Sequence, residues 1–195
     1  MAERGVIVSC ETIRCWCFKF GPQYAKLIGR KHGRLGNVWH VDELFVRIQG
    51  RQVYLWRAVD QDGDVLDILV TKHCDKQAAK HFFRKVLEHQ GQPPWKLITD
   101  RLKTYPAAHG EVFPSVRHRT AQYENNRAEV SHPHTREKER RMRRFRSVPQ
   151  AQQLLAVQGS VQNLFRVGQQ HLRADNHRLL RDRAFAEWKE VICIC

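Results

Sequence analysis

The sequence predicts an α/β fold in which a mixed sheet, made of three antiparallel strands plus parallel additions, is flanked by helices. Three observations predict it. Residues 39–70 are rich in aromatic and β-branched residues and are divided by two turn-forming stretches, which is typical of strands joined by tight connections. Residues 76–90 then carry apolar side chains at helical spacing. The apolar segment 95–100 follows that helix, and a helix that crosses back to a further strand adds it parallel to the sheet.

The composition fits one main domain with a strongly basic surface. The chain has 195 residues, of which 42% are hydrophobic, enough for one well-buried core and a small appendage. The formal net charge of +14 favours a polyanionic partner, because a cationic surface releases counterions when it binds phosphates. Nucleic acid is favoured over a membrane, since no long apolar run or basic amphipathic anchor is present. The first six residues lack the apolar core of a secretion signal, so we expect a cytoplasmic, nucleoid-associated protein.

The cysteines do not match a zinc-binding pattern. Two Cys-x-Cys pairs lie near opposite ends of the chain, without the two-residue gap of a zinc knuckle and without a histidine pair at finger spacing. We expect buried or incidental thiols. The six cysteines are Cys10, Cys15, Cys17, Cys74, Cys193 and Cys195.

The N-terminal segment 8–20 reads as a short amphipathic helix. Ser9 can cap it, apolar residues recur at helical spacing, and Gly21 followed by proline is expected to end it. The polar face carries Arg14 and Lys19, which could touch DNA if the segment is the recognition helix of a helix-turn-helix motif. The alternative is a helix that docks on the main domain. Residues 26–37 combine glycines with basic residues and predict a basic linker.

The segment 39–70 divides into three strands at 39–48, 52–59 and 65–70. The acidic stretch 60–64 between the last two resembles a calcium loop. Its glycine, however, occupies the fourth position instead of the sixth, and no glutamate closes the loop, so we expect a hairpin turn.

The next segments continue the α/β pattern. Asp75 can cap the helix 76–90, and Gly91 with two following prolines ends that helix. The strand 95–100 ends on Asp100. Residues 101–110 predict a short helix that contains a proline, and residues 116–119 predict a further short strand.

A strongly basic segment, 123–145, precedes two C-terminal helices. The segment begins at Tyr123, Glu129 lies near its start, and Arg136 follows Glu129 by seven residues, so the two share a face if the segment is helical. The C-terminal helices are expected at about 147–163 and 176–191, from their apolar spacing.

Three acids occupy positions that could converge. Asp42 lies inside the first strand, Asp100 at the end of the fourth and Glu129 on the helix that follows, which is the arrangement of a ribonuclease-H-like, retroviral-integrase-like core. A buried carboxylate needs a cation or hydrogen-bond donors, so Asp42 is the most telling of the three. The alternative is an ordinary pair between Asp42 and a neighbouring lysine or arginine. Glu43 is expected to point to the opposite face, which makes it a weaker candidate ligand.

Several motifs together resemble one protein family. They are Trp-His-Val-Asp-Glu at 39–43, the acidic hairpin at 60–67, Thr-Asp at 99–100, Asn-Asn-Arg-Ala-Glu at 125–129 and Arg-Arg-Met-Arg-Arg-Phe at 140–145. In this combination, which extends over roughly residues 8–191, the chain resembles the DDE transposases of bacterial insertion sequences, specifically the insertion-sequence-six family. The resemblance implies metal-dependent DNA cleavage and strand transfer.

The resemblance also implies a site and its partners. Asp42, Asp100 and Glu129 would bind two Mg²⁺ ions, for which Mn²⁺ can substitute, and Arg136 would contact DNA. Double-stranded DNA, as element ends and target, would be the substrate of a homodimer or higher oligomer. The expected organisation is a partial helix-turn-helix DNA-binding segment at 1–25, the basic linker at 26–37, a DDE catalytic core at 38–146 and C-terminal helices that pack on the core at 147–195. The further residues expected to bind DNA are Arg140, Arg143, Arg144, Lys103, Arg14 and Lys19.

Other functions remain open from the sequence. A structure-specific nuclease on the same fold would cut DNA without joining it. A catalytically inactive, truncated remnant would only bind DNA. Family members usually begin with a longer segment, and the 28 residues between Asp100 and Glu129 are fewer than the family's usual interval. An RNA-binding protein is disfavoured, since clustered surface aromatics are absent from the sequence pattern.

Overall fold

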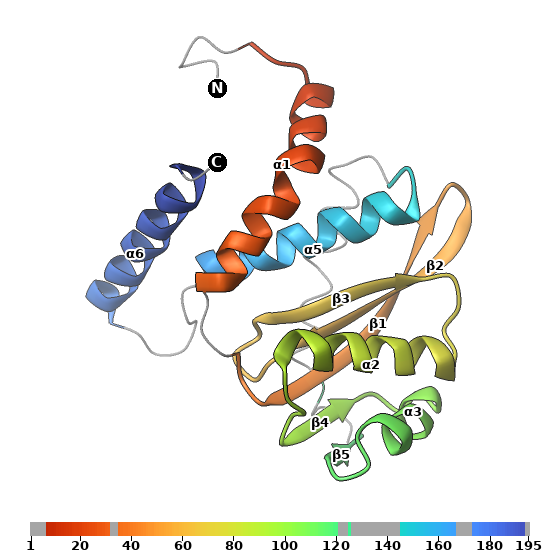
Figure 1. Ribbon diagram of the computed structural model, residues 1–195. Helices are drawn as coiled ribbons and strands as arrows, with labels where there is room; N and C mark the ends of the chain where they lie inside the picture. Colours follow the sequence, from red (N-terminus) through yellow and green to blue (C-terminus); the bar gives the residue numbers. More distant parts are fainter. Residues whose placement is uncertain (1–6, 32–34, 121–124, 126–144, 167–172, 194–195) are drawn as a thin grey trace.

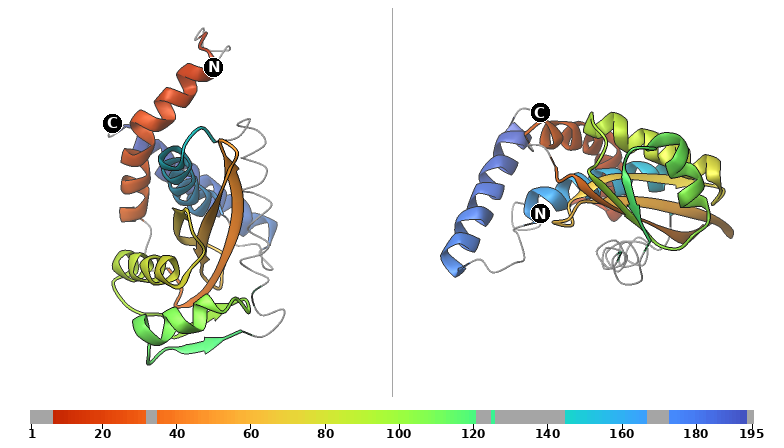
Figure 2. Two further views of the ribbon diagram at one scale, coloured as in Figure 1. Left: turned by 90° about the vertical axis from the view of Figure 1, so that its right-hand side faces the viewer. Right: turned by 90° about the horizontal axis from the view of Figure 1, so that it is seen from below.

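The computed structural model (Figure 1) describes residues 7–31, 35–120, 125, 145–166 and 173–193. Within them, a five-stranded sheet has the strand order β3-β2-β1-β4-β5. Helices α2 and α3 cover one face of this sheet, and α5 lies across the other (Figures 1 and 2). The predicted mixed α/β architecture is therefore confirmed.

The first three strands form the predicted antiparallel meander. They are β1 (Val38–Ile48), β2 (Arg51–Val59) and β3 (Val65–Thr71). Gln49 and Gly50, with φ of 52° and 77°, make the tight turn between β1 and β2. In the next turn the Asp60 carboxylate accepts hydrogen bonds from the backbone N–H groups of Asp62 and Asp64, both at 2.9 Å. The acidic stretch is thus a hairpin turn, as expected.

A helical crossover then adds two parallel strands. Helix α2 (Lys76–Gln90) begins at Asp75, whose carboxylate accepts from the Ala78 N–H, and ends at Gly91 with φ of 73°. Strand β4 (Lys96–Thr99) pairs parallel with β1. Helix α3 (Thr104–Val112) follows, and β5 (Arg117–Arg119) pairs parallel with β4. Asp100 directly follows the last residue of β4, as the sequence predicts.

The sheet separates two apolar clusters, because successive side chains of a strand point to opposite faces. Trp39 and Val41 of β1 pack under α2 and α3, together with the fully buried Phe82 and Phe83 of α2. On the other face, strand residues such as Val46 pack with α5 (Val148–Phe165). Each fully buried side chain of this size stabilises the fold by about 1.5–3 kcal/mol.

The N-terminal helix is longer than predicted. Helix α1 (Cys10–Lys31) begins after Ser9, whose Oγ accepts from the Thr12 N–H, but it continues through Gly21 and Pro22. The expected stop at these two residues is wrong, and residues 26–31 of the expected linker are helical.

Contacts with α5 explain why α1 continues. A proline at position 22 has no N–H to donate to the carbonyl of Phe18, and the Gln153 side chain of α5 donates to that carbonyl at 2.7 Å instead. Gly21 is buried, and a Cβ there would lie 3.2 Å from the Val157 methyl groups. Close packing on α5 therefore stabilises a helix that local propensity alone would end.

Helix α6 (Ala174–Cys193) completes the described chain. It packs with α1 and α5 through a third apolar cluster that includes Ile28, Leu164 and Val191. Both predicted C-terminal helices are present, each within a few residues of its expected ends. Of the helices in the described ranges, none has the length and apolar character needed to span a membrane.

Candidate active site

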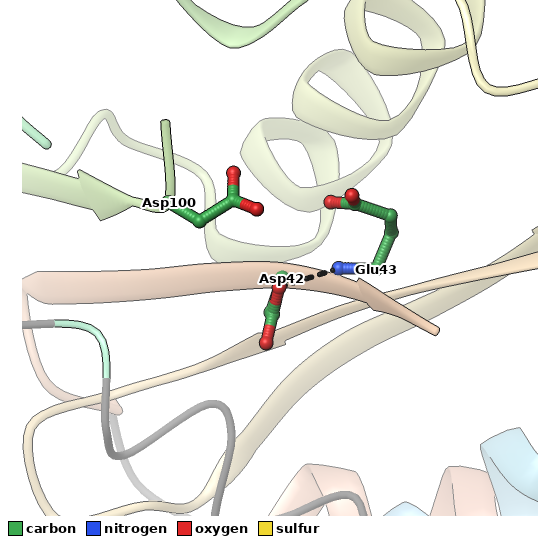
Figure 3. A group of neighbouring side chains, drawn as sticks. All are labelled: Asp42, Glu43 and Asp100. Atoms are coloured by element: carbon green, nitrogen blue, oxygen red, sulfur yellow. Dashed lines mark hydrogen bonds between the residues drawn. The ribbon is translucent and has the colours of Figure 1, made fainter. Parts of the chain in front are cut away.

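The acids at positions 42 and 100 meet where two parallel strands separate. The last residue pair of the β1–β4 ladder is Val41 with Thr99, so Asp42 and Asp100 are the next residues of neighbouring strands. One oxygen each of Asp42, Glu43 and Asp100 lies within 4.8 Å of the other two (Figure 3). Sequence positions 58 residues apart are thereby brought to one point of the sheet edge.

Glu43 belongs to this cluster, although it is expected from the sequence to be a weaker candidate ligand than Asp42. Its side chain does leave β1 on the α3 side, where its carboxylate accepts a hydrogen bond from the Tyr105 hydroxyl (Figure 3). The described pairing with β4 ends at Val41, however, so the strand edge is open at this point and the carboxylate can approach Asp100. The sequence carried a signal for this, because a β4 that stops at Asp100 leaves the second half of the longer β1 without that neighbour.

Backbone donors hold the two aspartates. Asp42 is 6% exposed, and its Oδ1 accepts from the Glu43 N–H at 3.0 Å. Asp100 Oδ1 accepts from the Leu102 N–H at 2.9 Å, as the first residue of the turn into α3. Both carboxylates thus have defined positions before any ligand binds.

Burial raises the pKa values of three groups at this site, those of Glu43, Tyr105 and Cys74. It raises the pKa of the Glu43 carboxyl, the hydrogen bond from Tyr105 opposes that rise, and the charge of Asp100 adds to it. Burial and the Glu43 carboxylate also raise the pKa of Tyr105 well above its usual value, so its hydroxyl remains a donor. Beside them, burial and the charges of Glu43, Asp100 and Asp75 raise the pKa of the Cys74 thiol to about 11.

A buried arginine lies across from Asp42. Arg57 of β2 is the register partner of Asp42 in the antiparallel ladder and is 3% exposed. It donates to Gln162 Oε1 of α5 at 3.2 Å, and burial together with the charge of Arg166 lowers its pKa to about 10. Asp42 therefore has a cationic neighbour on the same face of the sheet.

A hydrogen-bonded chain supports the end of β4 from β5. The Thr99 hydroxyl donates to the Asp100 carbonyl at 2.9 Å, so the 2.9 Å contact between Thr99 Oγ1 and His118 Nε2 needs the histidine as donor. Burial and the neighbouring His109, which stacks on His118 at 4.7 Å, lower the pKa of His118 to about 4. His118 is therefore neutral near pH 7 and carries its proton on Nε2.

The donor set suits a hard divalent cation. Three carboxylates supply oxygen ligands of the kind that Mg²⁺ and Mn²⁺ prefer. Among the described residues, the group that could hold a metal contains carboxylates and no thiol or imidazole, so it offers no soft ligand. The residues present therefore fit a magnesium-type site.

Asn125 is hydrogen-bonded directly beside this site. Its side chain is buried and donates through Nδ2 to the carbonyl of Val41 at 3.0 Å, one residue before Asp42. Asn125 is the first residue of the Asn-Asn-Arg-Ala-Glu motif. The predicted site residues that lie outside the described part of the chain are Glu129, Arg136, Arg140, Arg143 and Arg144.

The remaining predicted DNA-binding residues lie in two places. Lys103 is exposed, three residues after Asp100, directly before α3. Arg14 and Lys19 lie on α1, which is on the far side of the molecule from β4 and α3 (Figures 1 and 2). Arg14 pairs with Glu11 at 2.8 Å, and Lys19 lies 5.3 Å from the centre of the Phe20 ring.

Comparison with known proteins agrees with the family and the fold that the sequence predicts. A family model described as a DDE domain matches residues 36–168. The transposase for insertion sequence-like element IS431mec of Staphylococcus aureus is 31% identical over 160 residues, 80% of this chain and 70% of the relative. The transposase for insertion sequence element IS257 in transposon Tn4003, also from Staphylococcus aureus, is 31% identical over 157 residues, 78% of this chain and 68% of the relative.

Two solved structures share the fold. The integrase catalytic core domain of HTLV-2, in complex with magnesium and in a dimeric form, matches with a TM-score of 0.50 and 15% identity over 73% of this chain and 94% of its own. A chain of the simian T-cell lymphotropic virus intasome, in complex with PP2A regulatory subunit B56 gamma, matches with a TM-score of 0.50 and 16% identity over 74% of this chain and 53% of its own. The predicted retroviral-integrase-like core is thereby confirmed as the fold.

Proposed function

The chain belongs to the DDE-domain transposases of the insertion-sequence-six family, and from this premise we propose that Asp42, Asp100 and Glu129 together hold the cations for its reaction. Enzymes of this family are polynucleotidyl transferases that act on DNA and depend on divalent metal. We further propose that these three residues bind two Mg²⁺ ions and that Mn²⁺ can replace them.

The observation that carries the proposal is the meeting of Asp42 and Asp100 at the open edge of β1. The anchoring of Asn125 supports the third acid. Glu129 follows Asn125 by four residues, and four residues of chain span at most about 14 Å. Because the Asn125 side chain is bonded to the residue before Asp42, the length of the chain between positions 125 and 129 allows Glu129 to approach the two aspartates.

Each part of the chain then has a defined task. Asp42 and Asp100 present carboxylate oxygens from fixed backbone positions, and Glu129 completes the set. Bound cations would lower the pKa of the attacking water or 3′-hydroxyl and stabilise the leaving oxygen. The basic side chains hold DNA phosphates, which fixes affinity and register more than sequence choice. We assign this task to Arg136, Arg140, Arg143, Arg144 and Lys103.

The substrate we propose is double-stranded DNA, both as the ends of the element and as the target. Joining two ends calls for a homodimer or a higher oligomer, and a nucleoid location follows from the DNA partner. Arg14 and Lys19 would contact DNA from α1, as part of the N-terminal DNA-binding segment. This contact would occur away from the acids, because α1 packs on α5 and α6.

A strand-transfer assay tests the proposal. A labelled element end and a target plasmid are incubated with the protein and Mg²⁺, and joined product is measured. Asp42→Asn, Asp100→Asn and Glu129→Gln should each lower the rate by roughly a hundredfold or more, since cation stabilisation of such a transition state is worth several kcal/mol. Asp182→Asn, an exposed position on α6, is the matched control and should leave the rate unchanged.

The product pattern separates this function from the alternatives. Cut ends without joined product would indicate a nuclease. DNA binding with neither product would indicate a remnant that only binds. Full activity of Asp42→Asn would show that the acid assignment is wrong. Loss of activity supports the assignment when the unfolding temperature of the variant matches that of the unmodified chain.

A further inference from the structure

We propose that Glu43 is a further carboxylate ligand in this cation site and that Tyr105 is the residue that positions it. The inference rests on the proposed function, since it adds a fourth acid to the site of Asp42, Asp100 and Glu129. It follows from the arrangement of the described side chains, because Glu43 lies on the opposite face of β1 from Asp42, as strand alternation predicts, and its carboxylate still comes within 4.8 Å of the other two acids.

The open edge of β1 makes Glu43 available to the site. A side chain in the middle of a sheet is confined to its own face by the strands on either side. At Glu43 the described ladder with β4 has already ended, so its carboxylate can approach Asp100 beside the strand. Figure 3 shows the Glu43 and Asp100 carboxylates on the same side of β1, whereas the Asp42 side chain extends from the opposite side of the strand.

Tyr105 fixes the Glu43 carboxylate in this position. The Tyr105 side chain is fully buried, and its hydroxyl donates to Glu43 Oε2. Its ring has little freedom, because it stacks on the Phe83 ring, with 6.0 Å between the ring centres, and meets the Trp56 ring edge-on, with 5.7 Å between the centres. A hydrogen bond to one oxygen leaves the other carboxylate oxygen for a cation, which is the usual way in which outer residues orient a metal ligand.

A purely structural role explains this arrangement poorly. A buried tyrosine needs only one acceptor, and a neutral carbonyl would satisfy it. Here the acceptor is an acid held within 4.8 Å of two other carboxylates, where like charges repel one another. A divalent cation between them would turn that repulsion into attraction, so the geometry favours a bound cation.

Mn²⁺ binding tests the inference without any measurement of activity. The full chain is titrated with Mn²⁺ by isothermal titration calorimetry, and Kd is compared among variants. Glu43→Gln keeps the side-chain shape and an acceptor for Tyr105, yet it should weaken binding at least roughly tenfold. Tyr105→Phe keeps both ring contacts and should weaken binding by about tenfold, as loss of an orienting hydrogen bond does. Glu88→Gln, an exposed change on α2, should leave Kd unchanged.

The Asp100→Asn variant distinguishes a failure of the role of Glu43 from a failure of the proposed function. If Asp100→Asn weakens Mn²⁺ binding while Glu43→Gln and Tyr105→Phe bind as the unmodified chain does, the role of Glu43 is overturned and the proposed function stands. If Asp100→Asn also binds normally, the proposed site is wrong and the inference falls with it. Near-ultraviolet circular dichroism of each variant checks that the aromatic packing around Tyr105 is retained.

Discussion

Cys74 offers a test of the cation site that requires neither substrate nor turnover. Its thiol pKa is raised to about 11, first by burial and then by the charges of Glu43, Asp100 and Asp75. A divalent cation held between Glu43 and Asp100 would cancel the two larger charge effects on the thiol, while burial and Asp75 would continue to act. We therefore predict that Mg²⁺ lowers the pKa of Cys74 and accelerates its reaction with thiol reagents.

The expected size follows from the thiolate fraction. If the two carboxylates contribute about one pKa unit, cation binding raises the thiolate fraction about tenfold at a pH well below the pKa. A thiolate of lower pKa is also less nucleophilic, by about threefold per unit, because the Brønsted slope is roughly 0.4–0.5. The net acceleration should therefore be about threefold.

The assay uses a chain in which Cys74 is the only cysteine. Its reaction with a disulfide reagent is followed with and without saturating Mg²⁺, at a matched ionic strength set with K⁺. Asp100→Asn in the same background is the control and should remove the effect. The reasoning is refuted if Mg²⁺ gives no acceleration, or if K⁺ alone or the Asp100→Asn variant gives the same acceleration. The five cysteines to be replaced by serine are Cys10, Cys15, Cys17, Cys193 and Cys195.

Three further predictions concern stability. Gln153→Ala should lower the free energy of unfolding by about 1–2 kcal/mol, because it leaves the Phe18 carbonyl unpaired next to the proline of α1; urea unfolding measures this, and an unchanged midpoint would contradict it. Burial raises the pKa of the Asp67 carboxyl, but hydrogen bonds from His89 and Lys85 lower it overall. The ionised carboxylate therefore stabilises the fold above about pH 4, and this stabilisation is lost as pH falls through the lowered pKa of Asp67 in the folded chain. Asp67→Asn should reduce the loss of unfolding free energy with falling pH in that range. The pKa of His89 is raised chiefly by its hydrogen bond with Asp67, so His89 stabilises the fold below about pH 6.5, and this stabilisation is lost as pH rises through the pKa of His89 in the folded chain. The Asp67→Asn variant should remove this pH dependence as well, which a pH series of urea midpoints measures. Phe82→Ala should cost about 3–5 kcal/mol, as for other fully buried aromatic side chains, and a loss below 1 kcal/mol would show that the core under α2 is loosely packed.

Local patterns predicted most of the sheet. The meander, α2 and β4 follow from side-chain alternation, turn residues and caps, which act within a few residues of one another. The proximity of Asp42 and Asp100 also follows, because a parallel pairing of β1 and β4 places the ends of these strands together. The meander, α2 and β4 depend on short-range rules, so the sequence alone is sufficient for them, whereas the meeting of the two acids also requires the long-range pairing of β1 with β4.

The wrong helix stop and the low ranking of Glu43 as a ligand have a common physical origin. Gly21 and Pro22 are helix-ending residues by local propensity, yet Gln153 and Val157, more than 130 residues away, satisfy and pack the helix at that point. Strand alternation correctly places Glu43 on the face opposite Asp42, yet the end of β4 opens the edge and lets its carboxylate approach the other two acids. In both cases a distant part of the chain changes what a local rule permits.

The sequence by itself determined the family motifs, the order of strands and helices, and the acids at positions 42 and 100. Only the tertiary structure decided that Glu43 stands with those acids, that Tyr105 holds it, and that α1 continues along α5. Periodicity and capping act between near neighbours in the chain, whereas these contacts depend on where strands end and which helices pack together. That information is absent from any local stretch of residues, because it arises only when distant segments compete for the same space.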